Sequence, residues 1–189
     1  MIIAVVNGKG GVGKSTVSAL LASTLHRAEH SVGVVDRDPQ QSLAMWVESH
    51  EEPGFELARE GQKYDHVIID TPPRIEAEEL KDSVRRADLV LVVLTSSPLD
   101  AQATIAAAPS IRKSMKRSAR ACCLFTQVSK RSVLDRSLPK IAKLTGFPKL
   151  KSTLGLRTCY RTFFIEGWKA LTPAAREELY KLSLECLRK

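Results

Sequence analysis

The sequence has no long apolar run and nothing that resembles a leader. None of its apolar stretches approaches the roughly 20 residues that a helix needs to cross a bilayer. An apolar, strand-like segment begins at residue 2, without the basic segment and apolar core that mark a secretory signal. Repeats and low-complexity tracts are also missing. These absences favour a cytoplasmic globular protein over a secreted or membrane-spanning one.

Cysteine is scarce, and its spacing does not suit metal binding. The four cysteines form no C-x-x-C pair and no other metal-ligand pattern: Cys122, Cys123, Cys159 and Cys186. We therefore expect reduced thiols, as in a cytoplasm, rather than a disulfide framework or a zinc site.

Acidic residues are scarce in the second half of the chain. Residues 1–100 hold 10 Lys and Arg against 16 Asp and Glu, a net charge of −6. Residues 101–189 hold 19 against 5, a net charge of +14. Such an asymmetry within one domain predicts an electropositive face of the kind that binds a polyanion. A basic surface that is merely solvated is the alternative.

The most informative stretch is a glycine-rich loop between an apolar run and a helical pattern. Residues 2–6 are predicted to form a buried strand, and apolar residues after the loop recur at helical spacing. Between them, Gly8-x4-Gly13-Lys14-Ser15 has the pattern of a phosphate-binding loop. Lys14 would reach the β- and γ-phosphates, and the Ser15 hydroxyl would bind Mg²⁺. The predicted nucleotide-binding residues of this loop are Gly8, Lys9, Gly10, Gly11, Val12, Gly13, Lys14, Ser15 and Thr16.

Acidic residues end two further apolar strands. Asp36 ends residues 31–36 and is followed by Asp38, and Asp70 ends residues 64–70. The carboxyl ends of parallel strands meet at the edge of the sheet where nucleotides bind. We expect Asp70 to hold Mg²⁺ through water, as in a Walker B strand. One of Asp36 and Asp38 can support Mg²⁺ while the other positions water. The predicted metal ligands are Ser15, Asp36, Asp38 and Asp70.

The rest of the chain alternates strands with helices. Strands are predicted at residues 55–58, 87–94, 121–126 and 149–154, helices at 42–47, 75–86, 101–117, 132–145 and 172–188, and a loop at 127–132. Pro109 should kink or split its helix, and the helix between residues 46 and 70 should be reduced to a turn. We expect residues 149–154 at the sheet edge and His66 at the surface. The pattern predicts a single α/β domain, residues 1–189, with a doubly wound, mainly parallel sheet and helices on both faces.

The phosphate loop carries a second lysine, Lys9, where an ordinary loop accepts almost any residue. Residues 9–16 resemble the deviant Walker A box of the ParA/MinD family of P-loop ATPases. Residues 36–40 are similar to the family's D-x-D-P-Q switch I, and residues 70–73 to its switch II. The Ser-Pro-Leu-Asp string at 97–100 resembles the small ParF-type partition ATPases. We expect no helix-turn-helix domain before the phosphate loop, which fits that type. The resemblance covers nearly the whole chain.

This resemblance implies a weak ATP hydrolase that acts as a switch and uses ATP and Mg²⁺. In the family, the extra lysine crosses a homodimer interface to the partner's nucleotide, and loss of the second switch I acid typically stops hydrolysis. The predicted catalytic residues are therefore Lys9, Lys14 and Asp38. Many members carry an asparagine near Thr126 that reads adenine. Thr126 is a predicted nucleotide-binding position, and base selectivity stays open.

The resemblance also implies partners and a place in the cell. The ATP-bound homodimer is expected to bind nonspecific double-stranded DNA, and a ParB-like centromere-binding protein to stimulate hydrolysis. These properties describe a DNA partition ATPase on the nucleoid of a prokaryote. The candidates for DNA contact are Lys130, Lys140, Lys149, Lys151, Arg157 and Arg161.

Three alternatives stay open. A MinD-like ATPase would anchor its last helix in a membrane, but the apolar stripe here is narrow and lacks bulky aromatics, which favours core packing. A P-loop ligase of the dethiobiotin-synthetase kind would share the loop, but it would explain neither Lys9 nor the charge asymmetry. A relative that positions another cargo on the nucleoid would share the chemistry of a partition ATPase.

Overall fold

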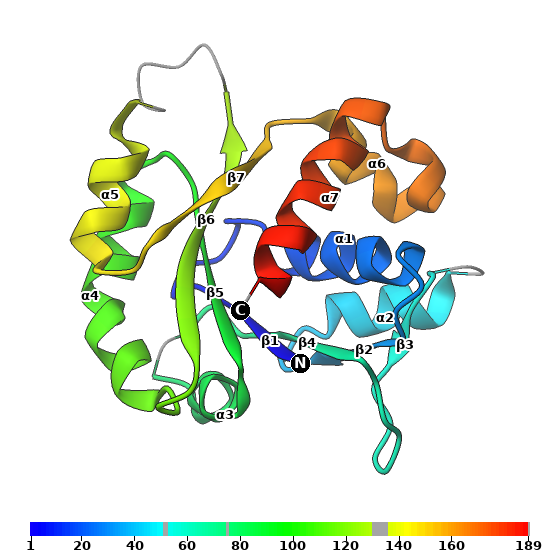
Figure 1. Ribbon diagram of the computed structural model, residues 1–189, viewed down its shortest axis with the longest axis horizontal. Coiled ribbons are helices and arrows are strands. Elements are labelled where there is room, and N and C mark those ends of the chain that lie inside the picture. The colour runs from blue at the N-terminus through cyan, green and yellow to red at the C-terminus, as the bar shows by residue number, and fades with distance from the viewer. Residues whose placement is uncertain (51–52, 75, 130–135, 189) are drawn as a thin grey trace.

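The computed structural model describes the chain except residues 51–52, 75, 130–135 and 189, and except the side chains of residues 98–100. In this described part, seven strands form one sheet in the order β3-β2-β4-β1-β5-β6-β7, and every neighbouring pair is parallel (Figure 1). The strands are β1 (Ile2–Val6), β2 (Val32–Asp36), β3 (Glu56–Leu57), β4 (His66–Asp70), β5 (Leu89–Leu94), β6 (Arg120–Val128) and β7 (Lys149–Gly155). The predicted parallel α/β sheet is confirmed, with β7 at one edge.

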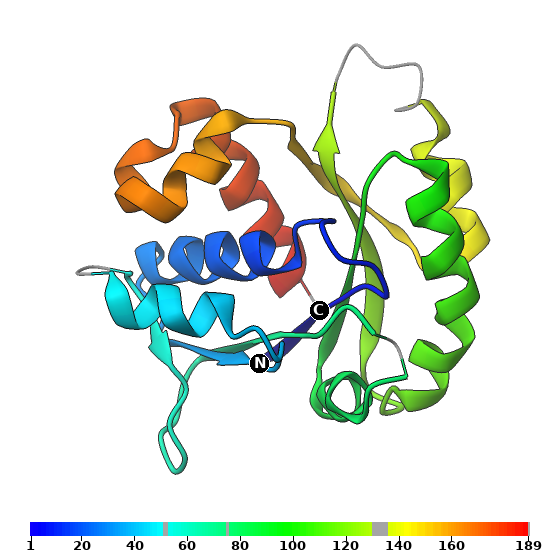
Figure 2. The ribbon, with the colours of Figure 1, turned by 180° about the vertical axis from the view of Figure 1, so that it is seen from behind.

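Helices cover both faces of this sheet (Figures 1 and 2). One face packs against α1, α2, α6 and α7, and the other against α3, α4 and α5. Their bounds are α1 (Lys14–Arg27), α2 (Ser42–Ser49), α3 (Glu78–Arg86), α4 (Pro98–Ser114), α5 (Leu138–Thr145), α6 (Thr158–Glu166), the 3₁₀ helix η2 (Gly167–Ala170) and α7 (Pro173–Leu187). The fold is therefore doubly wound.

The central strand, β1, is apolar along its whole length because both of its faces are buried. Ile3 and Val5 pack into the core on the α1 side, and Ala4 and Val6 into the core on the opposite side, because successive side chains of a strand alternate. All four are fully buried. A strand that is covered on both faces has no place for polar residues along its length. The polar residues of the site therefore lie where the strands end.

The last helix, α7, packs into the core. The Thr172 hydroxyl accepts a hydrogen bond from the Ala175 N–H at 3.2 Å, and Pro173 occupies the first turn. Leu184, by contrast, is 63% exposed on the outer side. The residues of the apolar stripe, each at most 2% exposed, are Leu171, Ala175, Leu179, Leu182 and Cys186. Core packing of this helix is confirmed. Among the described residues, no helix has the length and apolarity to cross a membrane.

The structure differs from the sequence expectation within α4. This helix continues through Pro109, where a kink or a split was expected, so it is not split there. Its neighbours Ala107, Ala108 and Ile111 are buried against the sheet side of the helix. This packing outweighs the cost of a proline inside a helix, about 3 kcal/mol.

Three smaller expectations had different outcomes. The strand β6 extends to Val128, into the predicted loop, and α5 begins at Leu138 rather than at 132, although residues 132–135 lie outside the described part. The described segment 58–65 contains no helix, as predicted. His66 is buried, not at the surface, and its ring contacts that of His30 at 4.7 Å between centroids.

Candidate nucleotide-binding site

The glycine-rich loop joins the end of β1 to the start of α1. Its backbone turns through Gly11 (φ 78°) and Gly13 (φ 92°), in a region that residues with a side chain rarely adopt. A Cβ atom on either residue would meet no atom within 4 Å, so conformation rather than crowding favours glycine. Gly13 makes no side-chain cap on α1. The first-turn N–H groups of α1 therefore face the loop as a potential anion site.

The two loop lysines have different surroundings. Lys14 is 6% exposed, and its ammonium donates to the backbone oxygen of Lys9 at 3.3 Å. Burial lowers the pKa of Lys14, and the negative charges of Asp70 and Asp38 partly offset this effect. Lys9 has an exposed side chain, and its backbone N–H donates to the Asn7 side chain at 2.8 Å. Lys14 is thus held inside the loop by one long hydrogen bond, which a phosphate oxygen could replace.

The end of β6 holds the loop from the neighbouring side. The Thr126 hydroxyl donates to the Val12 backbone oxygen at 2.8 Å, and the Gln127 amide donates to the Gly11 oxygen at 3.1 Å. Thr126 is buried, whereas Gln127 is exposed and has a positive φ of 55°. Both side chains therefore fix loop carbonyls, and direct nucleotide contact by Thr126 stays a prediction.

Asp70, the last residue of β4, is 1% exposed. Its Oδ1 accepts from the Ser18 hydroxyl at 3.1 Å, and Ser15 also hydrogen-bonds to this carboxylate. Its Oδ2 has no hydrogen-bond partner among the described residues. Burial raises the pKa of Asp70 to about 6, against the opposing effects of the Ser15 bond and the Lys14 charge. A buried carboxylate oxygen without a partner, beside a serine hydroxyl, fits the oxygen ligands that Mg²⁺ takes.

Asp36, the last residue of β2, and Asp38, two residues later, have different structural roles. The Asp36 carboxylate accepts from the N–H groups of Leu43 and Ala44, at the start of α2, and from that of Asp38, each at 3.0 Å. The Asp38 carboxylate accepts from the Gln40 N–H at 3.0 Å. Asp36 thus builds the turn that presents Asp38 near Lys14. A direct metal contact by Asp36 stays a prediction.

Replacing Asp70 with asparagine should stabilise the protein at neutral pH when neither nucleotide nor Mg²⁺ is present. The folded-state pKa of about 6 lies above the ordinary aspartate value of 3.8, so the contribution of Asp70 to stability is complete below the lower value. It is lost as the pH rises through the folded pKa. We expect the Asp70→Asn variant to gain about 1–3 kcal/mol of unfolding free energy near pH 7.5.

Denaturant unfolding at acidic and at neutral pH measures this effect. The gain should shrink toward pH ~4, where both proteins are neutral at this site. Asp65→Asn is the control, because Asp65 is exposed and its pKa is lowered by hydrogen bonds from Ser31. A wild-type protein more stable than Asp70→Asn at neutral pH would contradict the expectation.

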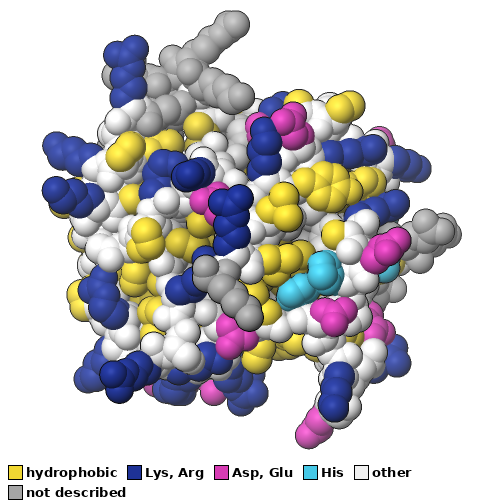
Figure 3. Space-filling view, viewed as in Figure 1, with side chains coloured by type: hydrophobic (Ala, Val, Ile, Leu, Met, Phe, Trp, Pro, Cys, Tyr) yellow, Lys and Arg dark blue, Asp and Glu magenta, His cyan; other side chains and the backbone are white. Residues whose placement is uncertain are grey.

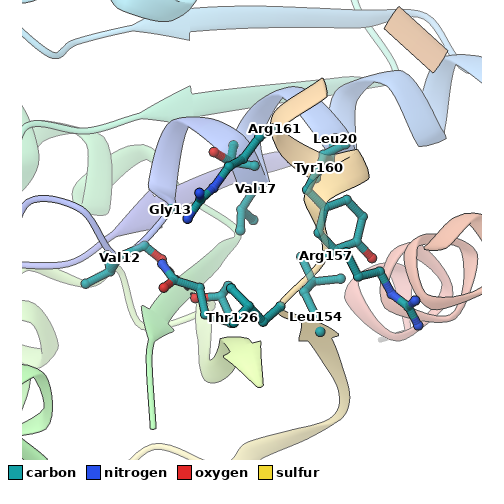
Figure 4. Close-up of a pocket in the computed structure, with 13 residues that line it drawn as sticks. Val12, Gly13, Val17, Leu20, Thr126, Leu154, Arg157, Tyr160 and Arg161 are labelled. Atoms are coloured by element: carbon teal, nitrogen blue, oxygen red, sulfur yellow. Dashed lines mark hydrogen bonds between the residues drawn. The ribbon is translucent and has the colours of Figure 1, made fainter. Parts of the chain in front are cut away.

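A cavity of about 90 Å³ lies beside the loop, between α1 and the segment that joins β7 to α6 (Figure 4). Apolar side chains from three elements form much of its wall, among them Val17 of α1, Leu154 of β7 and Tyr160 of α6. The cavity adjoins the phosphate loop and is mainly apolar, as nucleoside sites are, but its volume is smaller than the roughly 300–1,000 Å³ of typical ligand pockets.

Two of the six DNA candidates line this cavity. The Arg157 guanidinium points away from it toward α7, where it pairs with Glu178 at 2.6 Å (Figure 4). The Arg161 side chain extends from α6 toward Gly13. Arg157 is therefore committed to a contact within the fold, which the sequence reasoning did not anticipate.

The other candidates that the structure describes lie apart from those two. Lys149 and Lys151 begin β7 and so lie at the sheet edge opposite the phosphate loop, since the strands are parallel. Lys140 is exposed on α5, and Lys130 lies outside the described residues. In Figure 3, Lys and Arg side chains predominate over the α4 and α5 side, and acidic ones are more frequent over the α2 side. DNA contact by any of these residues stays a prediction.

Sequence reasoning missed residues that support the loop from a distance. Asn7 is fully buried and also donates its amide to the Val93 oxygen of β5. Its position just before the loop was an available signal. Ser18 lies one turn after Ser15 on α1, which is also a visible spacing. Glu178 had no local signal, because its partners lie some 20 residues earlier in the chain.

Comparison with known proteins agrees with this geometry. Maintenance of carboxysome distribution protein A of Halothiobacillus neapolitanus is 28% identical over 191 residues, which cover 92% of this chain and 88% of that protein. A putative plasmid partition protein of Borrelia burgdorferi, solved with AMPPNP, has a TM-score of 0.78 at 19% identity, with 97% of each chain covered. The cell division protein MinD of Aquifex aeolicus has a TM-score of 0.78 at 16% identity, covering 97% of this chain and 94% of that one.

The two solved structures share the fold, and the sequence match names the family. The family model described as the CobQ/CobB/MinD/ParA nucleotide binding domain matches residues 3–158, which include the loop, the acids after β2 and β4, and most of the cavity wall. The chain therefore belongs to the CobQ/CobB/MinD/ParA family of nucleotide-binding proteins.

Proposed function

We propose that this protein is a ParA-type ATPase that partitions DNA by switching between an ATP-bound dimer and a released state. The observation that carries the proposal is the second lysine, Lys9, exposed on a complete phosphate loop whose other lysine is buried. A single lysine suffices to bind phosphates, so a second one at the outer side of the loop favours contact with another subunit. The family match supports the binding of a nucleotide, whereas formation of a dimer is part of the proposal.

Within one site, the residues have separate tasks. Lys14 and the N–H groups of α1 bind the β- and γ-phosphates, and Lys9 of the second subunit adds positive charge to the γ-phosphate. Mg²⁺ would be held by Ser15 and Asp70, with Asp38 and Asp36 nearby, and would neutralise phosphate charge. Asp38 positions the water that attacks the γ-phosphate. The apolar cavity takes the base and sugar.

Dimer formation couples this chemistry to DNA. Two copies of the basic second half would form one surface for duplex DNA, bound without sequence preference and strongly dependent on salt. Lys140, Lys149 and Lys151 are the better candidates for this surface, because Arg157 and Arg161 line the cavity. A ParB-like centromere-binding protein stimulates hydrolysis, which opens the dimer and releases the nucleoid DNA.

A second candidate function differs only in cargo. The relative that is similar over 92% of this chain maintains carboxysome distribution, so the same switch would here position a protein assembly instead of a DNA site. A MinD-like membrane role has less support, because the apolar stripe of α7 is buried in the core.

Binding to nonspecific duplex DNA tests the proposal. It should be measured with ATP, with ADP and without nucleotide, each with Mg²⁺ at low and at high salt. We expect binding only with ATP, and much weaker binding at high salt, because released counterions drive it. Absence of DNA binding in all three states would contradict the proposal. Equal binding in all three states would contradict the part of it in which ATP controls DNA binding.

A further inference from the structure

The carboxylate of Glu178 on α7 gathers four hydrogen bonds from one short segment of chain. Its oxygens accept from the Gly155 N–H at 3.2 Å, the Tyr160 hydroxyl at 2.8 Å, and two nitrogens of Arg157 at 3.1 and 2.6 Å. The Glu178 side chain is 18% exposed. Burial opposes its ionisation, but these donors outweigh burial and lower the pKa of Glu178. The carboxylate is therefore charged and fully engaged.

All three partners of Glu178 line the cavity beside the phosphate loop. Glu178 itself is not among the residues of the cavity wall, and the Arg157 guanidinium turns away from the cavity to reach it (Figure 4). Glu178 thus holds the segment from Gly155 to Tyr160 against α7 from behind. Glu178 therefore contacts the wall of the cavity without lining it.

The phosphate side of the site is built without Glu178. Lys14, Ser15, Ser18 and Asp70 make their contacts with one another and with the loop. None of these hydrogen bonds involves the segment that Glu178 holds. A change at Glu178 should therefore act on one half of the nucleotide only.

We propose that Glu178 is a positioning residue for the nucleoside: through Arg157 and Tyr160 it fixes the wall that binds base and sugar, while it leaves the triphosphate site unchanged. This rests on the proposed function in one respect, that the cavity receives the nucleoside of ATP. Loss of the carboxylate charge leaves Arg157, whose side chain is 29% exposed, without its ion pair to α7. The wall then loses the contact that orients it.

The same helix offers two matched controls. Glu177, the preceding residue, is 66% exposed and pairs with Lys181 at 2.6 Å on the outer surface. Glu185 accepts from the N–H groups of Lys151 and Ser152 at 2.7 and 2.8 Å, and so also joins α7 to β7, but in the middle of the strand rather than at its Gly155 end. Glu185 therefore reports the effect of weaker α7 docking in general.

The test compares ATP with inorganic triphosphate, which lacks the nucleoside. Dissociation constants for both, with Mg²⁺, are measured for the wild type and for Glu178→Gln, Glu177→Gln and Glu185→Gln. We expect Glu178→Gln to weaken ATP binding about tenfold and triphosphate binding less than about twofold, since bonds to a charged group are among the stronger ones. The two controls should bind both ligands as the wild type does.

Several results would overturn the inference. These are an unchanged ATP affinity in Glu178→Gln, an equal loss for ATP and triphosphate, or the same ATP loss in Glu185→Gln. If Glu178→Gln does not fold, Tyr160→Phe replaces it. This variant removes one hydrogen-bond donor to Glu178 and should show a smaller loss of affinity, for ATP alone. An unchanged ATP affinity in Tyr160→Phe would contradict the role given to Glu178. A wild type that binds ATP no better than triphosphate would also overturn it. Failure of DNA binding, by contrast, affects the proposed function and not Glu178.

Discussion

Replacing Lys9 with alanine is expected to reduce ATP hydrolysis by ~10²–10³-fold while ADP affinity changes less than about twofold. The Lys9 side chain is exposed, whereas Lys14 is buried. In the proposed function, Lys14 and the α1 N-terminus bind the phosphates within the subunit. Removing Lys9 should therefore spare nucleotide binding and remove only charge stabilisation of the transition state. Steady-state phosphate release and ADP titration measure the two effects.

The matched control for Lys9 is Lys63→Ala, which removes an exposed lysine from the connection before β4. It should leave hydrolysis unchanged. In addition, wild-type hydrolysis per subunit should increase with protein concentration, because a lysine that acts on the other subunit needs a dimer. Hydrolysis in Lys9→Ala equal to that of the wild type would contradict the role given to Lys9.

Replacing Asp38 with asparagine is expected to reduce hydrolysis by at least about a hundredfold and to leave ATP binding close to wild type. Asparagine can still accept the Gln40 N–H bond that Asp38 accepts at 3.0 Å, and it keeps the backbone N–H that donates to Asp36. The turn should therefore persist while the negative charge that positions water is lost. ATP affinity and single-turnover hydrolysis measure the two effects.

Asp65→Asn is the control for the second prediction. Asp65 also accepts hydrogen bonds, from Ser31, but it precedes β4 and so lies at the sheet edge opposite the loop. It should hydrolyse ATP at the wild-type rate. If Asp38→Asn lost ATP binding together with hydrolysis, Asp38 would contribute to binding ATP rather than to positioning the attacking water.

The fold was predictable because its signals are local. An apolar run such as residues 2–6 is buried on both faces in a parallel sheet, and glycine or acid follows where the strand ends. The bounds of helices were harder to predict, because they depend on packing between distant residues. Burial of Ala108 and Ile111 keeps α4 continuous despite Pro109. The prediction that His66 lies at the surface was wrong. Its position at a strand start, next to Asp65, does not indicate that its ring contacts the ring of His30.

The site residues that belong to short sequence motifs could be predicted. The residues that support the site through contacts between distant parts of the chain could not. The loop, Asp38 and Asp70 lie together as the spacing indicated, because parallel strands end at one edge. Arg157 had the sequence character of a DNA contact, but its partner Glu178 is on another helix, 21 residues later. A basic residue seen in sequence does not show whether its charge is already paired.

The most direct test of the ATP-gated dimer mixes the two inactive variants. A Lys9→Ala subunit keeps Asp38, and an Asp38→Asn subunit keeps Lys9. If Lys9 acts on the nucleotide of its partner, a mixed dimer contains one complete site, and the mixture should hydrolyse ATP well above either variant alone. A mixture as inactive as its two components would contradict the account.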